Sequence, residues 1–286
     1  MIKNFFNISD LNKNDIYEII KLNSNHQNLL NKHIGLIFEK YSTRTRLSFN
    51  VAISSLGGNP IDIKFEELNF SRDESFEDTF KAMNCYLDGL IYRTSSHSKL
   101  INSSKYFEKP IINALSEISH PCQILSDLFT LQEYFKTLDL SILWIGDMNN
   151  VCFSLVEAAN IIEDLQLIIC SPKSISSQKD WLLKSNVTIV DSLKSFDLKF
   201  VNCVMTDVFI SMNDKESIEK ASILKDYSVD SKLMSQTHPN SVFMHCLPAK
   251  VGFEVTEEVF RSSRSIVWKQ AYNRMVAQKN LLQYIF

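Results

Sequence analysis

Hydroxyl and guanidinium side chains gather in the segment 39–46, directly after a short apolar run. Ser42, Thr43 and Thr45 supply hydroxyl donors. Arg44 can grip two oxygens of one anion at the same time. Helical spacing follows, so these groups stand at a predicted helix N-terminus, where free amides and the helix dipole favour an anion. A Ser/Thr helix cap beside surface arginines would use the same residue types, but the Arg-Thr-Arg arrangement favours a site for a phosphate-like dianion.

A second polar group follows the apolar run 110–115. His120 precedes Pro121, which suits the first turn of a helix, and Gln123 lies just inside that turn. A neutral imidazole or a side-chain amide at such a point donates a hydrogen bond to a carbonyl oxygen that becomes an oxyanion, and the Gln123 amide can also hold an adjacent amine. His-Pro is also an ordinary helix start, so the residue types alone leave a capping role open.

Cys246 directly follows the apolar run 241–245, at a predicted strand end. A thiol in that place is often only a small buried residue, but at an active site it can be a partner for an amine. The six cysteines of the chain show no C-x-x-C pair and no Cys/His spacing typical of zinc sites. We therefore expect no disulfide framework and no metal.

Short apolar runs alternate with stretches of helical spacing along the whole chain. The predicted strands are 33–38, 89–92, 110–115, 140–145, 166–170, 187–190, 200–205 and 241–245. The predicted helices of the first half are 46–56, 75–87 and 122–135. This alternation is typical of parallel sheets covered on both faces, in which ligands bind beyond the carboxyl ends of the strands.

We therefore expect an α/β fold with two doubly wound parallel-sheet domains joined by interdomain helices. The length of 286 residues suits two hydrophobic cores. We expect the first domain at 1–136, the second at 137–272, and a last helix at 273–286 that joins the first domain.

The composition is that of a folded protein, with 45% hydrophobic and 22% charged residues. A net charge of −3 and the lack of any long basic run argue against nucleic acid and anionic membranes as partners. The first ten residues lack the apolar core of a secretory signal and the Arg-rich character of a transit peptide, and no apolar run approaches the length of a membrane span. A cytoplasmic location is the expectation that follows.

The polar segments together resemble the signatures of the aspartate and ornithine carbamoyltransferase family. STRTR at 42–46 is similar to the family's carbamoyl-phosphate signature, and HPCQ at 120–123 to its H-P-x-Q. Further similar segments are RDESFEDT at 72–79, GDMNN at 146–150, TDVFISM at 206–212 and HCLPA at 245–249. The last three resemble the ornithine branch of the family.

The resemblance implies that a carbamoyl group passes from carbamoyl phosphate to the side-chain amine of L-ornithine, without a cofactor. The residues that it implies for carbamoyl-phosphate binding are Ser42, Thr43, Arg44, Thr45, Arg93, His120, Gln123, Cys246, Leu247 and Arg274. Those that it implies for ornithine binding are Asn150, Asp207, Ser211 and Met212. The implied catalytic residues are Arg44, His120, Asp207, Cys246 and Arg274. A homotrimer, or a multiple of trimers, is also implied, in which the loop around 69–72 approaches the site of the next subunit.

Three residues depart from the family's pattern. Tyr41 stands where Pro is common, Asn213 where Gly is common, and Tyr272 where Glu is common before Asn-Arg-Met. Asn is the best substitute for Gly at positive φ, so we expect the loop at 213 still to turn. The other two changes put the local loop packing in question.

Several rival functions follow from the same residues. A carbamoyltransferase for aspartate would show H-P-L-P-R at 245–249, and one for putrescine would lack the Ser211-Met212 element, while one for an acylated ornithine stays open. The intact arginines and His120 disfavour a catalytically silent binding protein on the same fold. No G-x-G-x-x-G follows a predicted strand, which disfavours a nucleotide-binding oxidoreductase. These residues do not separate citrulline synthesis from citrulline phosphorolysis.

Overall fold

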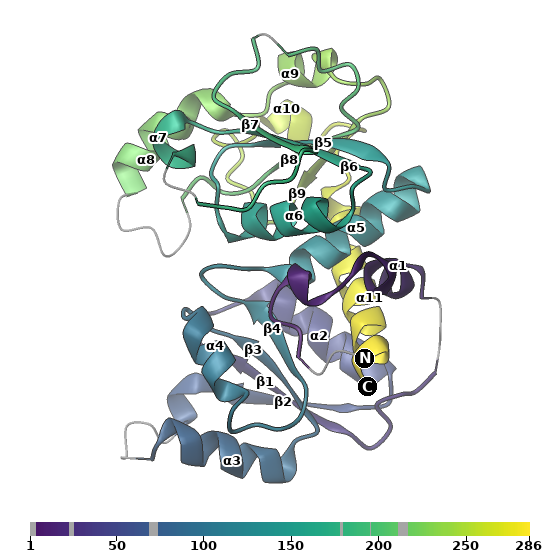
Figure 1. Ribbon diagram of the computed structural model, residues 1–286, viewed down its shortest axis with the longest axis vertical. Coiled ribbons are helices and arrows are strands. Elements are labelled where there is room, and N and C mark those ends of the chain that lie inside the picture. Colours follow the sequence, from purple (N-terminus) through teal and green to yellow (C-terminus); the bar gives the residue numbers. More distant parts are fainter. Residues whose placement is uncertain (1–3, 23–25, 69–73, 178–179, 195, 211–216) are drawn as a thin grey trace. The chain divides into compact units, whose positions relative to one another are not determined.

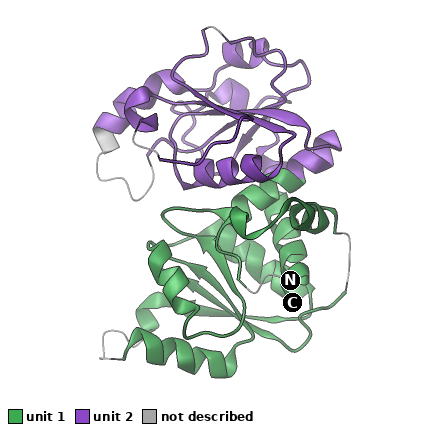
Figure 2. Cartoon of the chain, viewed as in Figure 1, with its two compact units in different colours: residues 1–129, 272–286 green, residues 130–271 purple. Residues whose placement is uncertain are grey.

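The computed structural model describes the chain except for residues 1–3, 23–25, 69–73, 178–179, 195 and 211–216. The sequence-predicted residues Ser211 and Met212, the departure Asn213 and the loop around 69–72 therefore lie outside the described residues. The chain divides into two compact units, one made of 1–129 with 272–286 and the other of 130–271, which Figure 2 shows in green and purple.

The first unit contains a four-stranded sheet in the order β2-β1-β3-β4. Its strands are β1 (His33–Phe38), β2 (Asn59–Lys64), β3 (Gly89–Arg93) and β4 (Ile111–Leu115), and all neighbours pair in parallel. The strand order changes direction between β1 and β3, so the carboxyl ends of these two strands are where an open sheet of this kind binds ligands.

Helices cover both faces of this sheet. They are α1 (Lys13–Lys21), α2 (Thr43–Ser55), α3 (Phe76–Tyr86), α4 (His97–Ser103), α5 (Pro121–Phe135) and α11 (Val267–Ile285), and the last two cross the division into the second unit. Figure 1 shows α3 and α4 on one side of the sheet and α2 with α11 on the other. One core cluster gathers Ile37, Phe80 and Leu90 with neighbouring apolar side chains.

The second unit contains a five-stranded parallel sheet in the order β7-β6-β5-β8-β9. Its strands are β5 (Leu140–Ile145), β6 (Leu165–Cys170), β7 (Val187–Val190), β8 (Cys203–Thr206) and β9 (Val242–His245). The helices are α6 (Asn150–Ile161), α7 (Lys173–Ser176), α8 (Ser217–Leu224), α9 (Ser231–Gln236) and α10 (Glu257–Phe260). The predicted class of two doubly wound parallel-sheet domains is confirmed, and the second direction change lies between β5 and β8.

The turn after β5 depends on a glycine. Gly146 has φ of +113°, and a Cβ atom there would lie 2.7 Å from the ring of Phe209. Both the backbone conformation and the close approach exclude a larger residue. Gly146 thus lets the chain turn from β5 toward α6 while Phe209 packs against the turn.

Among the described residues, no helix has both the length and the apolar composition that crossing a membrane requires.

Candidate active site

Helix α2 begins at Thr43, three residues before the predicted start at 46, and the hydroxyl-rich segment lies at this start. Ser42 is the N-cap with an extended backbone, and among the described residues its side chain makes no hydrogen bond to the free amides of the helix. The simple capping alternative is therefore not what the Ser42 hydroxyl does. Thr43 and Arg44 are exposed in the first turn, whereas Thr45 is only 2% exposed. The first turn of α2 thus presents amides, a hydroxyl and a guanidinium to the surface.

Arg274 joins three segments that are far apart in the sequence. Its guanidinium donates to Oγ1 of Thr45 on α2 at 3.0 Å and to Oε1 of Gln123 on α5. The side chain comes from α11 and is only 4% exposed. A buried guanidinium needs such partners because burial removes its water. The arrangement fixes the positive charge beside the first turn of α2.

His120 lies immediately before α5 and is 5% exposed. Its carbonyl oxygen accepts from the backbone amides of Gln123 and Ile124 at 3.1 and 3.4 Å, which fixes the start of the helix. Burial, and then the positive charges of Arg274 and Arg93, hold the pKa of His120 well below its usual 6.5. The imidazole is therefore neutral at ordinary pH and can donate to a carbonyl oxygen without a charge of its own.

Arg93 is the last residue of β3 and is partly buried. The neighbouring Tyr92 donates from its hydroxyl to Oε1 of Glu39 at 2.8 Å, and Ser95 donates from its backbone amide to the other Glu39 oxygen at 3.0 Å. Burial raises the pKa of Glu39, but hydrogen bonds from Ser95, Tyr92 and Thr94, together with the charge of Lys99, outweigh it and leave the pKa below its usual value. Glu39 thus ties the end of β1 to the segment around Arg93. The role of Glu39 was not predicted.

In the second unit, Asp207 is the centre of a small polar cluster at the end of β8. It is 8% exposed. One carboxylate oxygen accepts from the side-chain amide of Asn149 at 2.7 Å, and the other accepts from the Cys246 thiol and the Val208 amide, both at 2.8 Å. Cys246 itself is partly exposed beyond the end of β9. The structure therefore brings together a carboxylate and a thiol that stand 39 residues apart in the sequence.

Asn149 was missed at the sequence level, although a signal for it existed. Its side-chain oxygen accepts from the backbone amides of Val151 and Cys152 at 3.0 and 3.1 Å, which makes it the N-cap of α6. Asn is a favoured N-cap residue, and Asn149 precedes the first helical residue, Asn150. The cap is what aims the Asn149 amide nitrogen at Asp207.

His245 and Leu247 flank Cys246. The imidazole accepts at Nδ1 from the Leu247 amide at 2.9 Å, and its Nε2 lies 3.3 Å from a carboxylate oxygen of the fully buried Glu254. Leu247 has φ of 59°, an uncommon value for a branched side chain. One ligand atom each from Asp207, His245 and Cys246 lie within 4.8 Å of one another, a set of types that zinc accepts. Both imidazole nitrogens already face other groups, which makes His245 a poor third ligand.

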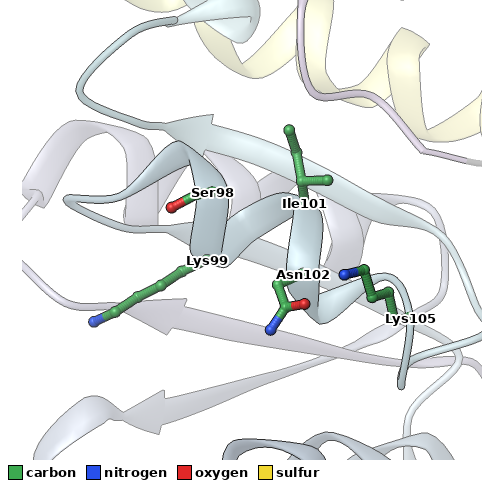
Figure 3. A pocket seen from close by; sticks show the side chains of 5 residues that line it. All are labelled: Ser98, Lys99, Ile101, Asn102 and Lys105. Atoms are coloured by element: carbon green, nitrogen blue, oxygen red, sulfur yellow. The ribbon is translucent and has the colours of Figure 1, made fainter.

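A hollow of about 410 Å³ lies over α4 and Lys105, two residues beyond the end of this helix. Figure 3 shows its lining by Ser98, Lys99, Ile101, Asn102 and Lys105. None of the sequence-predicted residues lines it. Lys99 also lies 3.9 Å from a carboxylate oxygen of Glu39. Lys99 thus links the wall of this hollow to Glu39.

Two family models match the chain. The carbamoyl-P binding domain of aspartate/ornithine carbamoyltransferase matches residues 3–133, and the Asp/Orn binding domain matches residues 138–285. The ornithine carbamoyltransferase of Methanosphaera stadtmanae is 38% identical over 301 residues, which is 100% of this chain and 99% of the relative.

Solved structures give the same similarity. The ornithine carbamoyltransferase from Pyrococcus furiosus has a TM-score of 0.89 at 32% identity and covers 99% of this chain and 96% of its own. The anabolic ornithine carbamoyltransferase from Campylobacter jejuni has a TM-score of 0.86 at 30% identity, with 99% of both chains covered. The similarity thus extends over both units.

Proposed function

The chain belongs to the aspartate/ornithine carbamoyltransferase family, and from this membership we infer that it transfers the carbamoyl group of carbamoyl phosphate to the δ-amine of L-ornithine. The products are L-citrulline and phosphate. The observation that carries the choice of ornithine is the Asp207 cluster, in which a nearly buried carboxylate accepts from Asn149 and Cys246. A carboxylate attracts an amine and repels the second carboxylate of aspartate.

For carbamoyl phosphate we propose binding by residues of two kinds. Backbone amides and hydroxyls at the start of α2 take the phosphate, together with the guanidinium groups, and His120 and Gln123 take the carbamoyl group. The proposed set is Ser42, Thr43, Arg44, Thr45, Arg93, His120, Gln123, Cys246, Leu247 and Arg274. Support comes from the hydrogen bonds that join Arg274 to Thr45 and Gln123.

For ornithine we propose binding by Asn150, Asp207, Ser211 and Met212. Asp207 is the residue with structural support, since its carboxylate is held in place by three donors. Asn150 opens α6 beside the Asn149 cap. Ser211 and Met212 belong to the proposal through the family resemblance alone.

The proposed chemistry is a direct displacement without a cofactor. The neutral δ-amine attacks the carbamoyl carbon, a C–N bond forms, and the bond from that carbon to the phosphate oxygen breaks. Arg44, Arg274 and the neutral His120 stabilise the negative charge that grows on the carbonyl and phosphate oxygens. Asp207 and Cys246 bind the amine and take part in removing its proton. Each of these five residues is a proposed catalytic residue.

We also propose a homotrimer. Leu47 and Val51 lie one turn apart on α2 and are 55% and 50% exposed, and Tyr41 just before the helix is 94% exposed. Residues four apart share one helix face. An apolar face of this kind on the helix that carries the phosphate-binding turn supports an interface between copies of the chain.

Three further assignments complete the proposal. A role in arginine biosynthesis has the support of the Campylobacter jejuni relative, whose name calls it anabolic. A cytoplasmic location has the support of all six cysteines being free thiols, as a reducing compartment keeps them. We propose domain limits of 1–136 and 137–272, with helix 273–286 joining the first domain. The support for this division is that one family match ends at 133 and the other begins at 138.

The direct test is a transfer assay with a variant that disables the phosphate site. Purified protein with carbamoyl phosphate and ornithine should form citrulline and phosphate in equal amounts. Arg44→Ala should lower kcat by about a hundredfold or more, because it removes a charged donor to the transition state. The variant should keep the unfolding temperature of the wild type, because Arg44 is exposed. A folded wild type that forms no citrulline would refute the proposed function.

A further inference from the structure

Asp127 is a buried acidic residue that the proposed chemistry does not use. It lies on α5, four residues after Gln123, and is 1% exposed. Gln123 donates from Nε2 to Oδ1 of Asp127 at 2.8 Å, and Gln123 is itself 1% exposed. Burying a carboxylate is costly, so this hydrogen bond to a buried neighbour on the same helix face calls for an explanation.

The oxygen of the Gln123 amide is held by a hydrogen-bond donor, whereas the nitrogen is held by an acceptor. Arg274 donates from its guanidinium to Oε1 of Gln123. A guanidinium has hydrogens to donate and no lone pair to accept, whereas a carboxylate accepts and has no hydrogen to donate. The amide of Gln123 therefore has one favoured orientation, with oxygen toward Arg274 and nitrogen toward Asp127.

This orientation decides what Gln123 can offer a ligand. The nitrogen end is engaged by Asp127 along α5, while the oxygen end faces the buried guanidinium that also holds Thr45 at the phosphate-binding turn. A carbonyl oxygen has two lone pairs, and Arg274 takes one. The second lone pair is an acceptor at a fixed place. A carbamoyl NH₂ group can donate to this acceptor, and the methyl group of acetyl phosphate cannot.

We propose that Asp127 is a positioning residue that makes the site select carbamoyl phosphate over acetyl phosphate, by holding the Gln123 oxygen toward the acyl group. The inference rests on the proposed function, because it takes Gln123 to meet the carbamoyl group. An amino and a methyl group have nearly the same size, so the shape of a pocket separates them poorly. A fixed acceptor separates them because only one of the two groups has a hydrogen to donate.

The experiment measures dissociation constants by titration calorimetry for three probes: carbamoyl phosphate, acetyl phosphate and inorganic phosphate. The variants are Asp127→Leu, which removes the acceptor at similar size, and Asp127→Asn, which keeps a weaker, uncharged acceptor. Asp230→Asn is the matched control, because Asp230 is the N-cap of α9 and Asn caps a helix equally well.

We expect the wild type to bind carbamoyl phosphate at least about tenfold more tightly than acetyl phosphate. This difference in affinity corresponds to one hydrogen bond. Asp127→Leu should remove most of this ratio by weakening carbamoyl phosphate about tenfold, with acetyl phosphate and inorganic phosphate within about twofold of wild type. Asp127→Asn should lower the ratio by about threefold, since a neutral hydrogen bond is roughly half as strong as a charge-assisted one. Asp230→Asn should leave all three constants unchanged.

An unchanged ratio in both Asp127 variants would overturn the inference. An equal loss of affinity for all three probes would also overturn it, because that pattern means a purely structural role. If Asp127→Leu does not fold, the ratio in Asp127→Asn decides. Binding does not require turnover, so a wild type that binds selectively but forms no citrulline would refute the proposed function and leave this inference standing.

Discussion

Burial and two guanidinium groups keep the His120 imidazole neutral, which assigns the pH dependence of the reaction to another group. The pKa of His120 lies well below 6.5, first because of burial and then because of Arg274 and Arg93. A depressed pKa means that the imidazole has already lost its proton at every pH above the usual value. An alkyl amine such as the δ-amine of ornithine has a pKa of about 10.4 and is mostly protonated at neutral pH.

We therefore predict that kcat/KM rises with pH between about 6 and 8.5, because the neutral fraction of the attacking amine increases with pH throughout this range below its pKa. His120→Gln, which keeps a neutral donor, should lower the rate at every pH and leave the slope of the profile unchanged. The measurement is the pH profile of citrulline formation for both proteins. A changed slope in His120→Gln would mean that the imidazole titrates in the working range after all.

Asp207 and Cys246 share one hydrogen bond but differ in chemistry. The carboxylate accepts from Asn149, Val208 and the thiol, so it organises the cluster, whereas Cys246 contributes a weak donor at its edge. We predict that Asp207→Asn lowers kcat/KM for ornithine by at least about a hundredfold and that Cys246→Ala lowers it by less, about tenfold. Steady-state kinetics of the two variants at one pH provide the comparison, and a wild-type rate in Asp207→Asn would contradict this account of the amine pocket.

Sequence reasoning found the chemistry-bearing residues better than it found their contacts. The loops that hold Ser42, His120 and Cys246 follow recognisable strand ends, so their positions beyond the sheet could be predicted. The hydrogen bond of Arg274 with Thr45 joins residues 229 positions apart, and no local pattern encodes it. Asn149 and Asp127 were overlooked because each acts through a neighbour and carries no reactive chemistry of its own.

At the scale of single elements, α6 shows how a helix cap places a polar group. The side-chain oxygen of Asn149 caps the helix. Because the same amide group also carries the nitrogen, this orientation directs the nitrogen to Asp207, to which it donates at 2.7 Å. The cap thus couples the stability of α6 to the geometry of the amine-binding carboxylate. Substitutions that separate the two bonds can test this coupling.

We predict that Asn149→Ser keeps the stability of the wild type within about 0.5 kcal/mol, because Ser caps helices as well as Asn does. The same variant should lower kcat/KM for ornithine by about tenfold, since the short hydroxyl cannot reach Asp207. Asn149→Ala should lower activity similarly and also destabilise the protein by about 1 kcal/mol. Denaturant unfolding and ornithine kinetics measure the two effects; full activity in Asn149→Ser would show that the bond to Asp207 is dispensable.

Most strands are marked in the sequence by a continuous apolar run, and one strand, β2, is not. The strands β1, β3, β4, β5, β6, β7 and β9 coincide with predicted apolar runs to within a residue, because buried parallel strands are nearly continuously hydrophobic. The edge strand β2 was missed, since its residues are largely exposed and include Asn59, Pro60 and Asp62. The run 200–205 was predicted as a strand, but β8 begins only at Cys203, where pairing with Ile142 starts. The preceding turn, closed by the Val201 amide on the Leu198 carbonyl, takes up 200 and 201, and Asn202 bonds to Ser141 and Val242 just before β8 begins.

At the scale of the whole molecule, helix α2 combines two proposed roles. Its first turn carries Ser42 to Thr45, and its exposed face carries Leu47 and Val51. Such apolar side chains gain little from water and favour contact with a second copy of the chain. The oligomeric state and the phosphate site are therefore expected to depend on the same helix.

We predict a trimeric mass for the wild type and a monomeric mass for the double variant Leu47→Glu/Val51→Glu, because two buried carboxylates without partners oppose association. Leu182→Glu is the matched control, since Leu182 is 80% exposed in the second unit and lies outside the proposed interface. Light scattering at micromolar protein concentration measures all three masses. A fully active wild-type monomer would contradict the trimer.

The most direct test of the central claim is a comparison of amine substrates. Carbamoylated product should be measured with carbamoyl phosphate and, in separate reactions, ornithine, putrescine, N-acetylornithine and aspartate. The acidic Asp207 cluster predicts a kcat/KM for aspartate lower than that for ornithine by about a thousandfold or more, because a second carboxylate meets a carboxylate. The Ser211-Met212 element predicts that putrescine, too, is a poorer substrate than ornithine. Turnover of aspartate, or of putrescine, at a rate comparable to that of ornithine would contradict the account.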